Sequence, residues 1–259
     1  MNFPSTLLTI ARNTFREAVR DRVLYNLVFF VLLITAAAVF LGELTAGNEA
    51  RVIVNLGLTA ILLFGAFIAI FVGIGLVSKE IERRTVFAIF SKPVARGEFI
   101  VGKYLGLCLT LLVNVAVMAL GVTLALIYVG GGALVASALA AILLIYFELI
   151  LLVAIAILFS TFSSPTLSAL LTFLIFVIGH FSSALEKIAE STGSNGARIF
   201  FHALYYFLPN LSFFAFITNA AHGQSPNALY LATAFGYALI YVVILLSVAS
   251  FIFGRRNFK

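Results

Sequence analysis

Apolar residues come in long uninterrupted runs along this chain, and charged residues punctuate them sparsely. Lys, Arg, Asp and Glu are absent from residues 23–42, 52–78, 104–147, 149–185 and 199–254. A helix needs about 20 apolar residues to cross the roughly 30 Å of hydrocarbon in a bilayer. Each of these runs is therefore long enough for at least one membrane-spanning helix.

Turn signals divide the longer runs. Gly130-Gly131-Gly132 lies inside the third run, and Ser163-Ser164-Pro165 breaks the fourth. The pattern predicts six spans, at residues 23–42, 54–77, 104–129, 133–159, 166–185 and 228–253. Because the runs are continuous and not alternating, they favour helices over a membrane barrel. We expect an all-α integral membrane protein that forms one domain over residues 1–259.

Composition excludes a water-soluble globule. Hydrophobic residues make up 63% of the chain and charged residues 10%, against about 45–50% and 25% in soluble proteins. The one cysteine, Cys108, permits no disulfide within the chain and no cysteine-rich metal site.

The basic residues predict the orientation of the spans. Thirteen of them fall in the N-terminal segment, the 78–103 loop and the C-terminal tail, and three (Arg51, Lys187 and Arg198) fall on the other side. The positive-inside rule then places both termini and that loop in the cytoplasm. We expect the chain in the cell (inner) membrane of a bacterium or archaeon. This asymmetry accounts for the net charge of +6 without nucleic acid as a partner.

Residues 5–22 predict an amphipathic helix along the cytoplasmic membrane surface. Leu7, Leu8, Ala11, Phe15, Ala18 and Val19 fall within one arc of a helical wheel, opposite Arg12, Asn13, Arg16, Glu17 and Arg20. The cationic side faces lipid headgroups or a partner. A simple membrane anchor is an equal alternative.

The 78–103 loop predicts a compact, half-apolar hairpin. Residues 80–90 are expected to form a short helix, and a second helix starts near residues 96–98 and continues into the third span. Val86, Phe87, Ile89 and Phe90 are unusually apolar for an exposed loop. This is the shape of a docking element, although the same residues also suit contact with the bilayer surface.

The segment 186–227 is expected on the outer side. Residues 199–217 are apolar, but Pro209 splits them into pieces too short to span. We interpret them as two short re-entrant helices in the outer leaflet, with an interfacial loop as the alternative.

Glu148 is the one acidic residue inside a predicted span. A charge at the bilayer centre costs about 2.5–3.5 kcal/mol on insertion scales, so the side chain needs a partner or water. Asn114 has a similar predicted depth, which makes a hydrogen bond between the two feasible. Either a substrate or proton path, or a hydrogen-bonded packing role, fits this possible intramembrane polar site.

Residues 80–106 also carry a resemblance. The pattern from Glu80 to Gly106, E-I-E-R-x-T-x-x-x-x-x-S-x-P-V-x-R-x-E-F-x-x-G-K-x-x-G, is similar to the loop of ABC-2 type transporter permeases. Tyr205-Tyr206-Phe207-Leu208-Pro209-Asn210-Leu211 resembles a stretch of the branch related to nitrous-oxide-reductase maturation and sodium-export permeases.

The resemblance implies a dimeric permease, of identical or different chains, that binds one ATPase subunit per chain and usually works as an exporter. ATP and Mg would be bound by the ATPase, and this chain would hold no cofactor. The docking residues implied are Glu80, Glu82, Arg83, Arg84, Val86, Phe87, Phe90, Pro93 and Arg96.

Enzyme chemistry is not indicated in this chain itself. Residues 97–104 read G-x-x-x-x-G-K-Y, but a phosphate-binding loop needs Ser or Thr where Tyr104 stands. His180, His202 and His222 are scattered and predict no metal site. The rival functions are an ion- or proton-coupled transporter that uses Glu148, and a non-transporting membrane scaffold.

Overall fold

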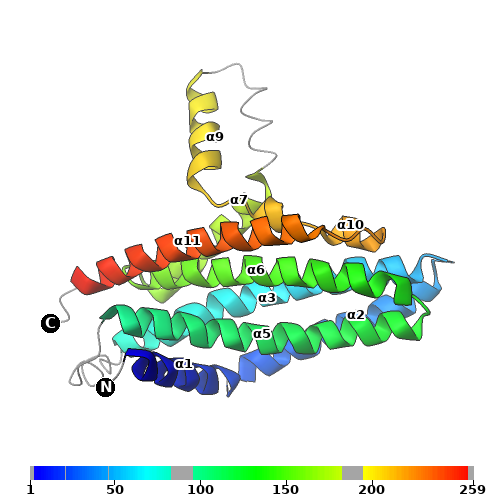
Figure 1. The fold of residues 1–259 in the computed structure, drawn as a ribbon, viewed down its shortest axis with the longest axis horizontal. Coiled ribbons are helices and arrows are strands. Elements are labelled where there is room, and N and C mark those ends of the chain that lie inside the picture. Colours follow the sequence, from blue (N-terminus) through cyan, green and yellow to red (C-terminus); the bar gives the residue numbers. More distant parts are fainter. Residues whose placement is uncertain (1–2, 21, 46, 83–95, 183–194, 256–259) are drawn as a thin grey trace.

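The computed structural model describes residues 3–20, 22–45, 47–82, 96–182 and 195–255. These residues are helical almost throughout, and no strand occurs among them. Five long helices lie side by side (Figure 1) and contain stretches long and apolar enough to cross a membrane. They are α2 (Arg22–Glu43), α3 (Glu49–Glu82), α5 (Arg96–Tyr128), α6 (Val135–Ser160) and α11 (Ala228–Arg255).

Helix α6 is the centre of the bundle. It packs against α3, α5 and α11, and against the shorter helices α7 (Pro165–His180) and α10 (Ile217–Ala221). Of its most apolar window, 72% is buried, against 22% for α2 and for α11. The outer faces of α2, α5 and α11 together carry most of the large apolar side chains that are exposed, which suits contact with lipid tails.

Helix α3 corrects one expectation. The second span was predicted to end at residue 77, before a separate short helix from residue 80. Instead α3 runs without interruption from Glu49 to Glu82. Its polar last turns simply continue the apolar helix, because nothing in Ser78-Lys79-Glu80 breaks a helix. The expected start of the next helix near residue 96 is confirmed, since α5 begins at Arg96.

The two predicted turns between helices are confirmed. Gly130, which follows α5, has φ +73°, a left-handed conformation that glycine adopts without steric cost. The 3₁₀ turn η1 (Gly132–Leu134) then leads into α6. At the other end of α6, Pro165 occupies the first turn of α7, where its missing N–H is not needed.

The predicted fifth span is shorter than expected. Helix α7 ends at His180 and not at residue 185, so its 16 residues cover about 24 Å, less than a bilayer core of roughly 30 Å. The 3₁₀ turn η2 (Leu211–Phe214) and α10 lie farther along α3 and α6. In Figure 1, α7 accompanies α6 over one part of its length and α10 lies toward the other end.

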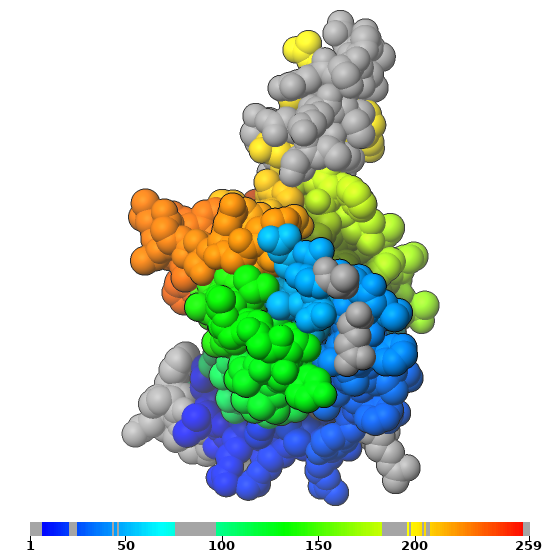
Figure 2. All heavy atoms as spheres, turned by 90° about the vertical axis from the view of Figure 1, so that its right-hand side faces the viewer, coloured from blue at the N-terminus to red at the C-terminus, as the bar shows by residue number. Residues whose placement is uncertain are grey.

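Helix α9 (Asn195–Phe207) separates these two pieces in the sequence. It stands away from the long helices, as the views from the side (Figure 1) and along the bundle (Figure 2) both show. The expected break at Pro209 is confirmed, because α9 ends at Phe207 and η2 begins at Leu211.

Helix α1 (Phe3–Val19) is amphipathic, and its buried side overlaps the predicted arc, although Thr14 lies outside that arc and Leu8 inside it. Thr14 and Ala18 are each 1% exposed, whereas Leu8 is 69% exposed. The buried side faces the beginning of α5, against which α1 packs extensively. The fully buried residues of α1 are small because the backbones of α1 and α5 come close together.

Candidate functional site

The predicted docking loop connects α3 to α5 at the end of the bundle where α1 begins and α11 ends (Figure 1). Glu80 and Glu82 belong to the last turn of α3, and Arg96 is the first residue of α5. The other predicted docking residues, Arg83, Arg84, Val86, Phe87, Phe90 and Pro93, lie outside the described residues. The loop thus joins two helices that both continue into the membrane bundle.

Helix α1 is fixed against α5 immediately after this loop. Gly102 and Gly106 form the small-residue face that their spacing predicts. A Cβ at Gly106 would lie 2.5 Å from Thr14 Cβ and 2.6 Å from the carbonyl oxygen of Ala11. A Cβ at Gly102 would lie 2.7 Å from Ile10 Cγ2. The absence of side chains at these two glycines is what permits the approach of α1.

An ion pair adds to the contact between α1 and α5. Lys103, which is 4% exposed, places Nζ 3.6 Å from Glu17 Oε2 on α1. Residues 97–104 are helical throughout as part of α5. A phosphate-binding loop needs a non-helical Gly-rich turn whose N–H groups converge on the phosphates, and this segment is instead regular helix.

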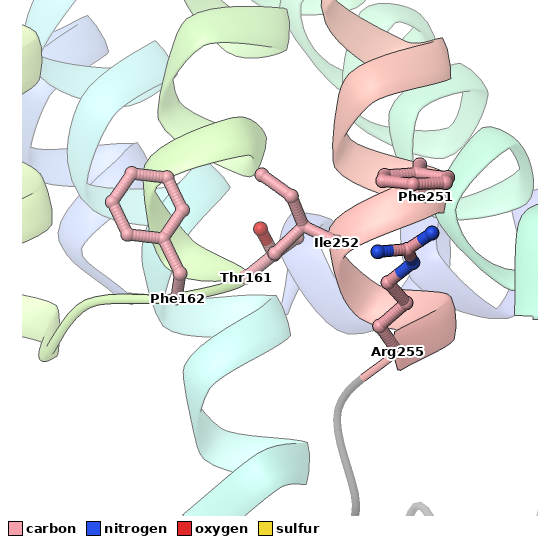
Figure 3. A pocket seen from close by; sticks show the side chains of 5 residues that line it. All are labelled: Thr161, Phe162, Phe251, Ile252 and Arg255. Atoms are coloured by element: carbon pink, nitrogen blue, oxygen red, sulfur yellow. The ribbon is translucent and has the colours of Figure 1, made fainter.

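A surface hollow of about 400 Å³ lies at the same end of the bundle, between the α6–α7 turn and the last turn of α11. Figure 3 shows its lining side chains: Thr161, Phe162, Phe251, Ile252 and Arg255. The Arg255 guanidinium lies 4.2 Å from the centroid of the Phe251 ring. This cation–π contact holds one of the tail cations at the bundle end.

Glu148 lies about halfway along the 26-residue helix α6. It is 1% exposed, and its Oε1 atom has no hydrogen-bond donor among the described residues. The carboxyl borders a cavity of about 330 Å³ that is lined by Asn55, Thr59, Leu62, Ile145, Glu148, His180, Phe214, Ala215, Ile217, Thr218 and Asn219. Four elements meet here: α3, α6, the end of α7 and the η2–α10 segment.

His180 is the ionisable neighbour of Glu148. Its Nε2 lies 3.5 Å from Glu148 Oε1, and it too lacks a hydrogen-bond partner among the described residues. Its Nδ1 lies 3.1 Å from the carbonyl oxygen of Phe176, one turn back in α7. His180 is thus held by its own helix and turned toward the carboxyl.

Asn114 is not part of this cavity, so the predicted pairing with Glu148 is wrong. The Asn114 side chain is buried, and its Nδ2 donates a hydrogen bond of 2.6 Å to the carbonyl oxygen of Thr110 in its own helix. An equal predicted depth along the bundle does not determine which way a side chain points. His180 was missed, although an ionisable residue near the end of a predicted span was a usable signal.

Metal binding has little support in the cavity. Glu148 and His180 provide two potential ligands, whereas protein metal sites with such side chains use three or four. Within the described ranges, no three His, Cys, Asp or Glu side chains lie together.

Comparison with known proteins is informative at the family level. A family model described as "ABC-2 family transporter protein" matches residues 8–258, which is nearly the whole chain, from within α1 to beyond α11. No curated protein matches significantly. With its five membrane-length helices and this match, the chain is a multi-pass membrane protein and belongs to the ABC-2 transporter family.

Proposed function

We propose that this chain is the membrane-spanning permease subunit of an ATP-driven exporter, powered by a separate ATPase. The near-complete family match supports the permease role. The subunit would pair with a second permease subunit, identical or different, and each permease would bind one ATPase. ATP and Mg would be bound by the ATPase. This chain would supply the substrate path and the helix that transmits the movement of the ATPase.

The continuity of α3 carries this proposal. Its 34 residues span about 50 Å from the predicted docking loop to the far end of the bundle. An ATPase that moves the loop would therefore displace one stiff element and not a hinged pair of helices. The start of α5, locked to α1 through Gly102 and Gly106, would move with it.

The proposed topology has six crossings. Helix α7 together with η2 and α10 makes the fifth, and both termini and the α3–α5 loop face the cytoplasm of the inner membrane. The 13-to-3 distribution of basic residues supports this orientation. The Gly223–Pro226 connection and the α9 segment then lie toward the outer side.

Co-purification from the native host tests the docking role. Phe87→Asp introduces a charge into the apolar part of the loop, and Arg83→Glu reverses one of its charges. We expect either variant to lose the ATPase chain that accompanies the wild type. Arg51→Glu is the matched control, because this exposed arginine lies at the opposite end of the bundle. Retention of the ATPase by both loop variants would contradict the proposal.

The cavity at Glu148 favours one second candidate function, an ion- or proton-coupled carrier. A purified chain in vesicles that transports along an ion gradient without ATP would establish that function. Transport that requires both ATP and the ATPase would exclude it.

A further inference from the structure

The cavity beside Glu148 brings two hydrogen-bond acceptors face to face. The carbonyl oxygen of Phe176 can only accept, so the Nδ1 of His180 that contacts it at 3.1 Å carries a hydrogen and donates it. A neutral imidazole has only one N–H, and therefore Nε2 presents a lone pair. That lone pair faces Glu148 Oε1 at 3.5 Å.

An ionised Glu148 opposite a neutral His180 would be unfavourable here. Both atoms are buried and without another hydrogen-bond partner in the described part of the chain. A buried carboxylate needs a donor or a counter-charge. One proton held by the pair provides both, since it supplies the missing hydrogen bond and brings the total charge of the pair from −1 to zero.

We propose that Glu148 and His180 form a binding site for one exchangeable proton, shared between Oε1 and Nε2. The proton comes from water: either an O–H bond forms on the carboxyl or an N–H bond forms on the imidazole, and hydroxide or buffer base takes the proton up again. No other reactant is needed. This inference does not depend on the ATPase partnership.

The cavity supplies a route for exchange. Its volume of about 330 Å³ leaves room for water beside the pair. Asn55 and Thr59 from α3 line it, as do Thr218 and Asn219 from the α10 segment. These side chains can hydrogen-bond water but carry no charge. Glu148 and His180 are the titratable groups among the described lining residues from α3, α6, α7 and η2–α10.

Occupancy of the site bears on the broken fifth crossing. Glu148 belongs to α6, and His180 is the last residue of α7. With the proton bound, a hydrogen bond between His180 and Glu148 joins the end of α7 to α6. Without the proton, Nε2 and Oε1 are both acceptors, so this hydrogen bond between the two helices is lost.

Spectroscopy of the full-length protein in lipid nanodiscs tests the site without a transport assay. Three histidines occur in the chain, so ¹⁵N-histidine labelling yields few signals, and His180→Gln assigns one of them. Infrared difference spectra on raising the pH report the carboxyl. We expect one proton per chain to be lost as the pH is raised. A protonated-carboxyl C=O band, or an imidazolium signal from His180, should then disappear, and this change should be absent in Glu148→Gln.

Controls separate this site from other titrating groups. His222 makes the same contact between Nδ1 and a carbonyl one turn back, at 2.8 Å from Thr218, but it is exposed. His222→Gln should leave the Glu148 signal unchanged. If Glu148→Gln does not fold, His180→Gln should shift the carboxyl band instead.

Two results would overturn the proposal. One is a Glu148 carboxylate beside a neutral His180 at every pH at which the wild type is folded. The other is displacement of the proton by millimolar Na⁺ or K⁺ at constant pH, because the pair would then be a metal-cation site.

Discussion

Gly106 sets the distance between α1 and α5, because any side chain at this position meets the α1 backbone. We predict that Gly106→Ala destabilises the protein by about 1–3 kcal/mol, the usual cost of overpacking. The added Cβ would lie 2.6 Å from the Ala11 carbonyl oxygen, a backbone atom that cannot rotate away. Thermal unfolding of the full-length protein in detergent measures the loss.

Gly97→Ala is the matched control, since it makes the same change in the same helix. The nearest atom to its new Cβ is Ser250 Oγ at 3.9 Å, an ordinary contact. Alanine is favoured over glycine in a helix by about 1 kcal/mol, so this variant should be neutral or slightly stabilised. Equal effects of the two substitutions would show that the close approach at Gly106 does not matter.

Residue spacing predicted the existence of this contact but not the element that makes it. Gly102 and Gly106 lie one helical turn apart, which reveals a face without side chains whatever packs there. That the partner is α1 follows from Thr14 and Ala18 being small enough to be buried against it. For Glu148, too, the sequence indicated a site but not the residue that contacts it. An isolated charge marked the site, whereas its neighbour His180 depends on the rotation of α6 and on where α7 ends.

At the scale of elements, the non-helical stretch before η2 is stabilised by a polar cluster around Asn210. The Oδ1 atom of Asn210 accepts hydrogen bonds from Ser182 and Ser212, and its backbone N–H donates to the Tyr237 hydroxyl at 2.8 Å. These bonds join the end of α7, η2 and α11. They provide partners for a non-helical stretch that lipid could not hydrogen-bond.

We predict that Asn210→Ala lowers the free energy of unfolding by about 1–3 kcal/mol, because two hydroxyls lose a shared acceptor in a largely buried setting. Thermal or denaturant unfolding in detergent measures the change. Asn26→Ala, an exposed position on α2, should stay within about 0.5 kcal/mol of the wild type. A change at Asn210 no larger than that at Asn26 would contradict the role of the cluster.

Uncharged runs predicted the long helices well and the broken one poorly. The predicted span 23–42 became Arg22–Glu43, because the cost of burying a charge fixes where a span can end. No charge marks the end of α7. It ends where a Cβ at Gly179 would lie 3.0 Å from the Pro209 carbonyl oxygen and where Ser182 bonds to Asn210. Those contacts come from residues about 30 positions away, which no local pattern reports.

At the scale of the whole molecule, the number of crossings and the position of the ends constrain each other. Helices α1 and α11 have their free ends at the same end of the bundle (Figure 1), which requires an even number of crossings. Five helices have membrane length. We therefore propose that the remaining crossing, the fifth along the chain, consists of α7 together with the η2–α10 segment, which follow one another along α3 and α6.

Cysteine labelling in intact cells tests this arrangement, and replacement of the one native cysteine, Cys108, by alanine provides the background. Ser164 precedes α7 and Ser225 follows α10, and both are exposed. We predict that a membrane-impermeant maleimide labels Ser225→Cys from outside, and that Ser164→Cys reacts only after the membrane is opened. Labelling of both positions from the same side would mean that the α7–α10 unit does not cross. The α11 tail would then lie opposite the α3–α5 loop, and the thirteen-to-three distribution of basic residues in the sequence would have no topological explanation.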